Sequence, residues 1–328
     1  MLTIYSDDHH LHHGAAELID GTFKPCFEMP SRADMVLARA RAVGLGDVIS
    51  PLDFGLAPIR RVHSAGFVNF LQNAWSDWQA LGRSHDMLPM TWPIRRLRDI
   101  EPGDIDGKLG FYSFDAGAPI TAGTWQAAYS AAQVALSAQQ EIANGAHSAF
   151  ALCRPPGHHA AGELMGGYCY LNNAAIAAQA FLDQGRQRVA ILDVDYHHGN
   201  GTQDIFYNDP RVAYFSSHES GIYPHSGAPY ERGVGNVFNA LLPPGSGGFR
   251  FQNTWADELL PALEDFRPQL VFISAGFDAH MRDPLADLML ETEDFGWLTR
   301  QLRTLADRHA GGRVVSMLEG GYDLDALR

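Results

Sequence analysis

The sequence is short of cysteine, of basic residues and of long apolar runs. Its three cysteines, Cys26, Cys153 and Cys169, are widely spaced in 328 residues. They form neither a CxxC metal knuckle nor a paired disulfide framework, so we expect a reducing compartment. No apolar run is long enough to cross a bilayer, and the N-terminus MLTIYSDDHH lacks the basic and apolar regions of a secretion signal. We therefore expect a soluble, cytoplasmic protein.

The scarcity of basic residues sets the charge of the chain. Lys and Arg total 24 against 38 Asp and Glu, which gives a formal net charge of -14. Such a chain repels phosphate backbones and anionic lipid, so we expect neither nucleic-acid nor membrane binding, and a cationic ligand is favoured. An acidic surface that only keeps the protein in solution accounts for the same charge.

From about residue 120 the sequence alternates between helical and strand patterns. Helices are predicted at 123–145, 172–185, 251–266 and 294–309, and strands at 148–153, 189–194, 212–217, 236–243, 269–276 and 313–318. Several strands are continuous apolar runs, which is typical of a parallel sheet covered by helices on both faces. We predict a single domain over 1–328, with a long inserted loop at about 84–122 that is rich in Pro, Gly and charge.

Polar clusters follow five of the predicted strands. In chain order they are RPPGHH (154–159), DVDYHH (193–198), SSHES (216–220), GFDAH (276–280) and EGGYD (319–323). Ligands of open parallel sheets bind at the carboxyl ends of the strands. The sequence therefore predicts a functional site at this edge of the sheet.

The end of the run VAILDVDYHH predicts a metal site. Strand alternation places Asp193, Asp195 and His197 on one side. Burial of unpaired carboxylates is costly, so a cation or a dense hydrogen-bond network must compensate. Asp and His together suit Zn²⁺, Fe²⁺ or Mn²⁺ better than Ca²⁺, and Asp278 offers a third ligand from a nearby strand end. Three protein ligands leave a position open, as in catalytic metal sites.

Two adjacent histidines and a tyrosine supply groups for acid–base chemistry. His158 and His159 follow a stiff Pro-Pro-Gly turn, and two adjacent histidines beside a predicted metal suit general acid–base work near neutral pH. Each ring needs a partner that fixes its tautomer, and Asp193 and Asn200 are the candidates. Tyr322 follows two glycines, which allow a tight turn to direct the phenol toward a developing oxyanion.

The chain resembles the zinc-dependent histone deacetylase superfamily. The similarity extends from IYSDDH to Tyr322, and its motifs are RPPGHH, GGYCYLNNAA, ILDVDYHHGNGTQDIFY, AGFDAH and LEGGY. Within the superfamily the bacterial acetylpolyamine amidohydrolases are most similar, through FKPCFEMPSRAD, VHSAGFVNFL, PIRRLRD, IDGKLGFYSFDAGAPITAGTW and the Asn200 of HHGNG. The resemblance implies an arginase/deacetylase-like three-layer α/β fold with a central eight-stranded parallel sheet. It also implies a homodimer in which the 84–122 insertion lies at the interface and narrows the active-site mouth.

The resemblance further implies a role for each matched residue. One Zn²⁺ per chain would bind three side chains: Asp195, His197 and Asp278. Tyr322 would polarise the acetyl carbonyl, and His159 would act as general base and then general acid. His158 would be an electrostatic partner oriented by Asp193, and Asn200 would neighbour His159. A monovalent cation, K⁺, would bind mainly backbone oxygens of five residues: Asp193, Asp195, His197, Ser216 and Ser217.

The same resemblance predicts a narrow channel for the substrate. Tyr168 and Tyr223 would line it, and the carbonyl of Gly167 would face the substrate amide. We expect acidic residues at its mouth, Asp106 on the insertion or Glu17 near the N-terminus, to attract a distant ammonium group. Another polar segment, DDHHLHH from Asp7 to His13, is expected to be a solvated loop at the rim rather than a metal site.

The predicted function is removal of acetyl groups from acetylated small amines, such as N-acetylputrescine or N-acetylcadaverine, by a zinc-dependent amidohydrolase. The alternative is a deacetylase of acetyl-lysine or of another acylated amine that uses the same site. A binding protein for acylated amines without activity would not need His159, Tyr322 and three metal ligands. A two-metal phosphoesterase, compatible with the Asp-x-His spacing alone, would need further bridging ligands and gives Tyr322 no role.

Overall fold

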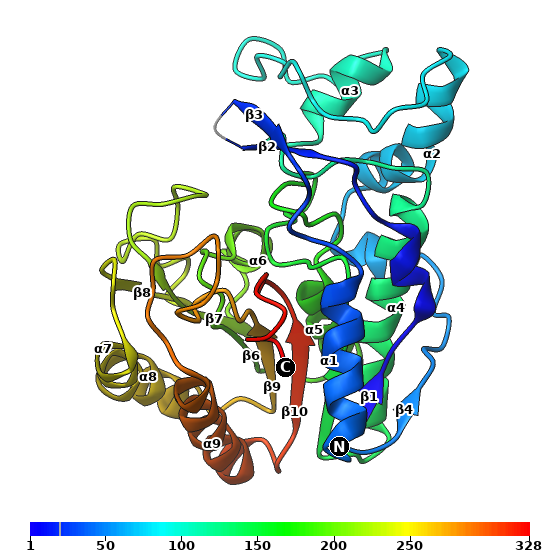
Figure 1. Ribbon diagram of the computed structural model, residues 1–328. Coiled ribbons are helices and arrows are strands. Elements are labelled where there is room, and N and C mark those ends of the chain that lie inside the picture. Colours follow the sequence, from blue (N-terminus) through cyan, green and yellow to red (C-terminus); the bar gives the residue numbers. More distant parts are fainter. Residues whose placement is uncertain (20) are drawn as a thin grey trace.

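The computed structural model describes residues 1–19 and 21–328. At its centre is an eight-stranded sheet in the order β4-β1-β5-β10-β9-β6-β7-β8, in which every neighbouring pair is parallel (Figure 1). The strands are β1 (Leu2–Ile4), β4 (Val48–Ile49), β5 (Ser148–Ala151), β6 (Val189–Asp193), β7 (Val212–Glu219), β8 (Val237–Leu242), β9 (Leu270–Ala275) and β10 (Val314–Leu318). The predicted eight-stranded parallel sheet is confirmed.

Helices lie on both faces of this sheet (Figure 1). They are α1 (Ser31–Ala42), α2 (Ala65–Ala80), α3 (Ile105–Phe111), α4 (Thr124–Ala143), α5 (Asn173–Asp183), α6 (Asn200–Phe206), α7 (Gly248–Thr254), α8 (Leu260–Phe266) and α9 (Thr292–His309). A π-helical turn, Trp255–Leu259, joins α7 to α8, so the predicted helix at 251–266 is continuous but locally widened. No helix in the described part of the chain is both long and apolar enough to span a bilayer.

Alternate strand residues build a separate core on each face of the sheet. Val189 and Ile191 of β6 pack in the core that contains α4 and α5. Ala190 and Leu192 pack in the opposite core with residues of the π-helical turn, α8 and α9. Because β6 is apolar on both sides, burial on both faces stabilises it as a central strand. Helix α1 covers the same face as α9, further along the sheet, against Phe150 of β5.

The insertion at 84–122 is partly helical rather than a simple loop. Asp104 caps α3 by accepting a hydrogen bond from the backbone N–H of Gly107. Ile105 and Leu109 of α3 are buried in one cluster with Phe70 of α2. The glycines and prolines of this segment weaken its helical pattern in the sequence, whereas packing against α2 stabilises the helix in the fold. The antiparallel hairpin β2 (Glu17–Ile19) and β3 (Thr22–Lys24) lies beside the insertion (Figure 1).

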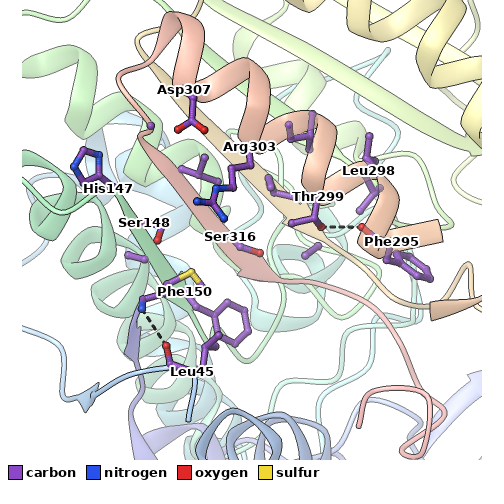
Figure 2. A pocket seen from close by; sticks show the side chains of 18 of the residues that line it. Leu45, His147, Ser148, Phe150, Phe295, Leu298, Thr299, Arg303, Asp307 and Ser316 are labelled. Atoms are coloured by element: carbon purple, nitrogen blue, oxygen red, sulfur yellow. Dashed lines mark hydrogen bonds between the residues drawn. The ribbon is translucent and has the colours of Figure 1, made fainter. Parts of the chain in front are cut away.

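A cavity of about 700 Å³ opens between α9 and the sheet. Figure 2 shows Leu298, Thr299 and Arg303 of α9 facing Ser316 of β10 and Phe150 of β5. Its walls are mainly apolar, and none of the predicted site residues lines it. The predicted site residues therefore lie outside this cavity.

Candidate active site

Five adjacent central strands bring the polar clusters together. The strands that precede them, β5, β10, β9, β6 and β7, are consecutive in the sheet. Because all five strands run in the same direction, their carboxyl ends meet at one edge. The register places Asp193 of β6 level with Ser274 of β9 and Ser216 of β7. The predicted gathering of these segments at one edge is confirmed by this topology.

Asp195, His197 and Asp278 converge on one point. Nδ1 of His197 lies 3.3 Å from Oδ1 of Asp195 and 3.1 Å from Oδ2 of Asp278. Both carboxylates are buried, and one ligand atom from each of the three residues lies within 4.8 Å of the others. Zinc–ligand bonds of about 2.0–2.2 Å require tetrahedral ligand separations of roughly 3.3–3.5 Å. The three donors therefore fit a single divalent cation of the zinc class, whose charge would compensate the two buried carboxylates.

Backbone donors and a glycine hold the two carboxylates in place. Asp195 accepts hydrogen bonds from the N–H of Gly320 at 2.8 Å and of His197 at 2.9 Å. Asp278 accepts one from the N–H of Tyr196 at 2.8 Å. A Cβ atom at Gly320 would lie 2.5 Å from Oδ2 of both aspartates, so only glycine allows this approach. The first glycine of EGGY thus has a steric role next to the metal ligands.

The two adjacent histidines have different partners. Nδ1 of His158 lies 3.0 Å from Oδ2 of Asp193, which also accepts a hydrogen bond from the hydroxyl of Tyr214. Nδ1 of His159 lies 2.7 Å from Oδ1 of Asn200, whose Nδ2 donates to the carbonyl of His159. With Nδ1 donating to Asn200, Nε2 of a neutral His159 carries a lone pair. The geometry therefore pairs the histidines with Asp193 and Asn200 in the way that the sequence suggested.

The electrostatic environment also shifts the pKa values of the two rings in opposite directions. Burial and then the neighbouring charge of His158 lower the pKa of His159 well below its usual value. Burial also opposes charge on His158, but Asp195 and Asp193 outweigh it and raise the pKa of that ring well above its usual value. A cation on Asp195 would offset part of this effect. His159 is thus the neutral ring that can accept a proton, and His158 with Asp193 forms a charged pair beside it.

Tyr322 is held by a buried arginine that sequence analysis did not single out. Arg32 of α1 donates from Nε to the carbonyl of Gly321 and from Nη2 to that of Glu319, both at 2.5 Å. Its guanidinium carbon lies 4.8 Å from the centroid of the Tyr322 ring. The backbone N–H of Tyr322 donates to Asp283 at 2.7 Å. No local sequence pattern links Arg32 to a loop nearly 290 positions away, so only the fold reveals this contact.

The same arginine belongs to a buried charged network. Glu28 accepts from Nη1 of Arg32 at 3.0 Å and from Nε of Arg154 at 2.8 Å. Arg154 begins the RPPGHH segment and donates to the carbonyl of His9. The network therefore joins α1, the histidine turn and the tyrosine turn, so it stabilises the relative positions of the catalytic groups.

The aromatic residues predicted to line the channel pack against one another and contact an acidic residue, Asp115. The rings of Tyr168 and Tyr322 lie edge to face with centroids 5.6 Å apart, and Phe114 stacks on Tyr223. Asp115 accepts from the Tyr223 hydroxyl at 2.5 Å and from the N–H of Gly167 at 3.0 Å. Asp115 was missed by sequence analysis, although it lies in the FYSFDAG segment of the insertion. Gly167 and Tyr168 both have positive φ, 53° and 65°, which is a strained backbone for the tyrosine.

The two acidic residues expected at the channel mouth are both engaged. Glu17 is 2% exposed and accepts from the hydroxyl of Tyr168 at 2.6 Å. Asp106 forms a two-pronged ion pair with Arg83, at 2.6 Å and 2.9 Å. The arginine offsets the charge of Asp106, so this residue is poorly suited to attract an ammonium group. Glu17 and Asp115 instead hydrogen-bond Tyr168 and Tyr223, two of the residues predicted to line the channel.

The predicted monovalent-cation residues lie at the ends of β6 and β7. The hydroxyl of Ser216 lies 2.8 Å from Nδ1 of His218, and the hydroxyl of Ser217 accepts from Nε1 of Trp255 at 3.0 Å. Both hydroxyls are thus hydrogen-bonded within the protein. His198, for which the sequence suggested no role, lies 2.8 Å from Ser226 and so tethers the segment that carries Tyr223.

The buried carboxyl group of Glu319 should make the stability of the metal-free fold depend on pH. Burial raises the pKa of Glu319 to about 7, and the nearby charge of His158 only partly opposes this effect. The folded metal-free protein then binds a proton that the unfolded chain releases above pH ~4.5, so the carboxyl group destabilises the fold progressively between about pH 5 and 7. Glu319→Gln keeps the side-chain shape and should remove up to about 3 kcal/mol of this loss. Urea unfolding of the metal-free parent protein and variant at pH 5 and pH 7.5 measures the free energy of unfolding. An equal change of that free energy with pH in both proteins would contradict the prediction.

Comparison with known proteins agrees with this site. The histone deacetylase domain model matches residues 26–328. Acetylpolyamine amidohydrolase 2 and acetylpolyamine amidohydrolase 1 of Pseudomonas aeruginosa are 56% and 50% identical, each over 100% of this chain and 95% of the relative. The acetylpolyamine amidohydrolase of Mycoplana ramosa is 38% identical over 100% of this chain and 96% of its own length.

Solved structures show the same similarity. An acetylpolyamine aminohydrolase from Burkholderia pseudomallei superposes with a TM-score of 0.92 at 36% identity, covering 100% of this chain and 95% of that one. The fold and the convergent Asp, His and Tyr side chains define a metal-dependent deacetylase. The chain belongs to the histone deacetylase family, as its motifs predicted.

Proposed function

We propose that this protein is a zinc-dependent amidohydrolase that removes the acetyl group from acetylated small amines and releases acetate and the free amine. Acetylpolyamines such as N-acetylputrescine and N-acetylcadaverine are the proposed substrates. The observation that carries the proposal is that His159 and the turn that carries Tyr322 lie against the three-ligand metal centre at one sheet edge. The names of relatives at 50–56% identity support the substrate class.

The reaction follows from the positions of these groups. Asp195, His197 and Asp278 would hold the Zn²⁺, which would supply Lewis-acid polarisation of the carbonyl and lower the pKa of a water molecule to about 7. His159 accepts the proton of the attacking water at Nε2 and then donates it to the leaving amine. Tyr322 donates a hydrogen bond to the carbonyl oxygen as negative charge develops there.

The neighbouring residues keep these groups oriented and charged as the reaction requires. Asn200 fixes the tautomer of His159 through the 2.7 Å contact. Asp193 orients His158, whose ring lies next to that of His159 and acts as its electrostatic partner. We assign a K⁺ ion to backbone oxygens around Asp193 and Ser216, where it would balance the acidic centre.

The residues of the proposed channel suit a slender substrate that carries a positive charge at the end far from the acetyl group. Tyr168, Tyr223 and Gly167 would enclose an alkyl chain, and the acidic partners of the two hydroxyls, Glu17 and Asp115, would attract an ammonium group. A net charge of -14 adds long-range attraction for a cation. Acetyl-lysine carries the same acetamide on an alkyl chain, so a deacetylase of acetyl-lysine remains the second candidate.

Turnover of three substrates tests the proposal. For the zinc-loaded protein we expect kcat/KM for N-acetylputrescine and N-acetylcadaverine to exceed that for an acetyl-lysine peptide by about tenfold or more. Tyr322→Phe is the matched control, because it removes one oxyanion donor and should lower kcat about 10²–10³-fold on every substrate. Turnover of the peptide alone would contradict the substrate class, whereas no turnover at all would contradict amide hydrolysis.

We also propose that the insertion forms a homodimer interface. Met90, Ile94 and Leu97 are 92%, 69% and 83% exposed on one short segment, a costly arrangement for a free surface. Leu97→Glu should convert a dimer to a monomer in sedimentation velocity and raise KM, because the partner would no longer narrow the mouth. Phe249→Glu, on an equally exposed phenylalanine of α7, is the control and should leave the oligomeric state unchanged. A monomeric parent protein would refute this interface.

A further inference from the structure

A second group of metal-binding side chains lies outside the active site. The 3₁₀ turn Asp7–Leu11 packs beside α1, and its two adjacent histidines both face Asp34 of that helix. Nε2 of His10 lies 3.0 Å from Oδ1 of Asp34, and Nε2 of His9 lies 3.5 Å from the same oxygen. One ligand atom from each of the three residues lies within 4.8 Å of the others.

The tautomer of His10 is fixed by its second nitrogen. Nδ1 of His10 lies 3.1 Å from the backbone carbonyl oxygen of Asp7, which can only accept, so Nδ1 must donate. Nε2 of the neutral ring then presents a lone pair to the carboxylate of Asp34, at 3.0 Å and 3.2 Å from its two oxygens. Two acceptors in contact require a cation between them, either a proton or a metal ion. A backbone carbonyl that fixes the other nitrogen is the usual partner of a metal-bound histidine.

The third member of the cluster, His9, is buried against the same carboxylate. Its side chain is 3% exposed. Its Nε2 also lies 2.9 Å from the hydroxyl of Tyr5, which is close enough to hydrogen-bond a ligand bound at the same place.

The site is open to an ion from solvent. A concavity of about 470 Å³ is lined by Tyr5, Asp7, His10, Asp34 and Arg41, among other residues. The side chains of His10 and Asp34 are 46% and 47% exposed. The two aspartates outweigh the single arginine, so the local charge favours a cation.

We propose that His9, His10 and Asp34 form a second metal site of this protein, distinct from the active-site centre. Two imidazoles and one carboxylate suit a divalent ion such as Zn²⁺, Ni²⁺ or Cu²⁺, and suit Mg²⁺ or Ca²⁺ poorly. The donor separations of 3.0 Å and 3.5 Å bracket the roughly 3.3–3.5 Å edge of a tetrahedral zinc site. Solvent supplies the fourth position.

The site also has a structural link to the catalytic residues. The carbonyl of His9 accepts a hydrogen bond from Arg154, which precedes the turn that carries His158 and His159. A metal ion on His9 would therefore anchor the 3₁₀ turn to α1 at one end of the buried charged network. Binding should stabilise the fold without contributing to the chemical step.

Metal content of the full-length protein tests the proposal with Zn²⁺ alone as the probe. After dialysis against buffered micromolar zinc, mass spectrometry should find about two ions per parent chain and about one in His10→Ala and in Asp34→Asn. Calorimetric titration of the metal-free proteins should show the second site weakened about 10–100-fold or more in both variants. Both changes are at exposed positions, and circular dichroism verifies that the variants fold.

His13→Ala is the matched control, because His13 is an exposed histidine of the same segment and is not part of the cluster. It should retain about two ions per chain. One ion in the parent protein, or two in His10→Ala, would overturn the proposal. Equal loss in His13→Ala and His10→Ala would mean that the histidine-rich segment binds zinc without a defined site. Stoichiometry is independent of turnover, so failure here leaves the proposed deacetylation untouched.

Discussion

Replacement of His197 by alanine should remove the active-site metal and lower kcat by about three orders of magnitude or more. His197 supplies the only nitrogen among the three converging donors in the described structure. Without it, the carboxylates of Asp195 and Asp278 remain as two buried anions, and an ion between them loses its neutral ligand. Lewis-acid stabilisation of the transition state amounts to several kcal/mol, and each ~1.4 kcal/mol is a factor of ten in rate.

Two measurements on this variant separate metal loss from misfolding. Zinc content by mass spectrometry should fall by about one ion per chain, and kcat on N-acetylputrescine should fall with it. Circular dichroism should still show the α/β fold, because no backbone hydrogen bond depends on the His197 imidazole in the described part of the chain. His13→Ala, an exposed histidine, should keep its kcat. Retention of both zinc and kcat by His197→Ala would exclude the three-residue centre.

The sequence predicts the metal centre well because the chemistry lies where strands end. Asp195, His197 and Asp278 each follow an apolar run, and parallel strands bring their carboxyl ends to one edge whatever the loops do. The same argument cannot predict the contacts of Asp115 or Arg32. Their contacts to Tyr223 and to Gly321 join segments that no periodicity relates, and they depend on how the insertion and α1 pack.

The acidic residues expected at the channel mouth were predicted less well than the metal ligands. Asp106 was a reasonable candidate for an ammonium-binding residue, since it is an acid on the insertion. Its partner Arg83 lies 23 positions earlier, beyond the reach of any local helical pairing. Conversely, Glu17 looks like a surface residue in the sequence but is buried against Tyr168. Whether a charge is free or paired is decided by tertiary contacts, so specificity is harder to predict than the reaction.

Replacement of His159 by glutamine should lower kcat about 10²–10⁴-fold with a much smaller change in KM. Glutamine is uncharged and keeps part of the ring's volume, but it cannot accept the proton of the attacking water and pass it to the leaving amine. In the parent enzyme kcat/KM should fall at low pH, as His159 becomes protonated and is lost as a base. Burial lowers the pKa of this ring, so the fall should lie well below pH 6.5.

The pH profile and a second variant test this assignment directly. His159→Gln should retain zinc and lose the acidic limb of the profile, because no ring remains to titrate. His158→Gln should reduce kcat less, since His158 is engaged with Asp193 and contributes charge rather than a mobile proton. If His158→Gln proved the more severe variant and removed the limb instead, the roles of the two histidines would have to be exchanged. The different partners of the two rings, Asn200 and Asp193, make the first outcome the expected one.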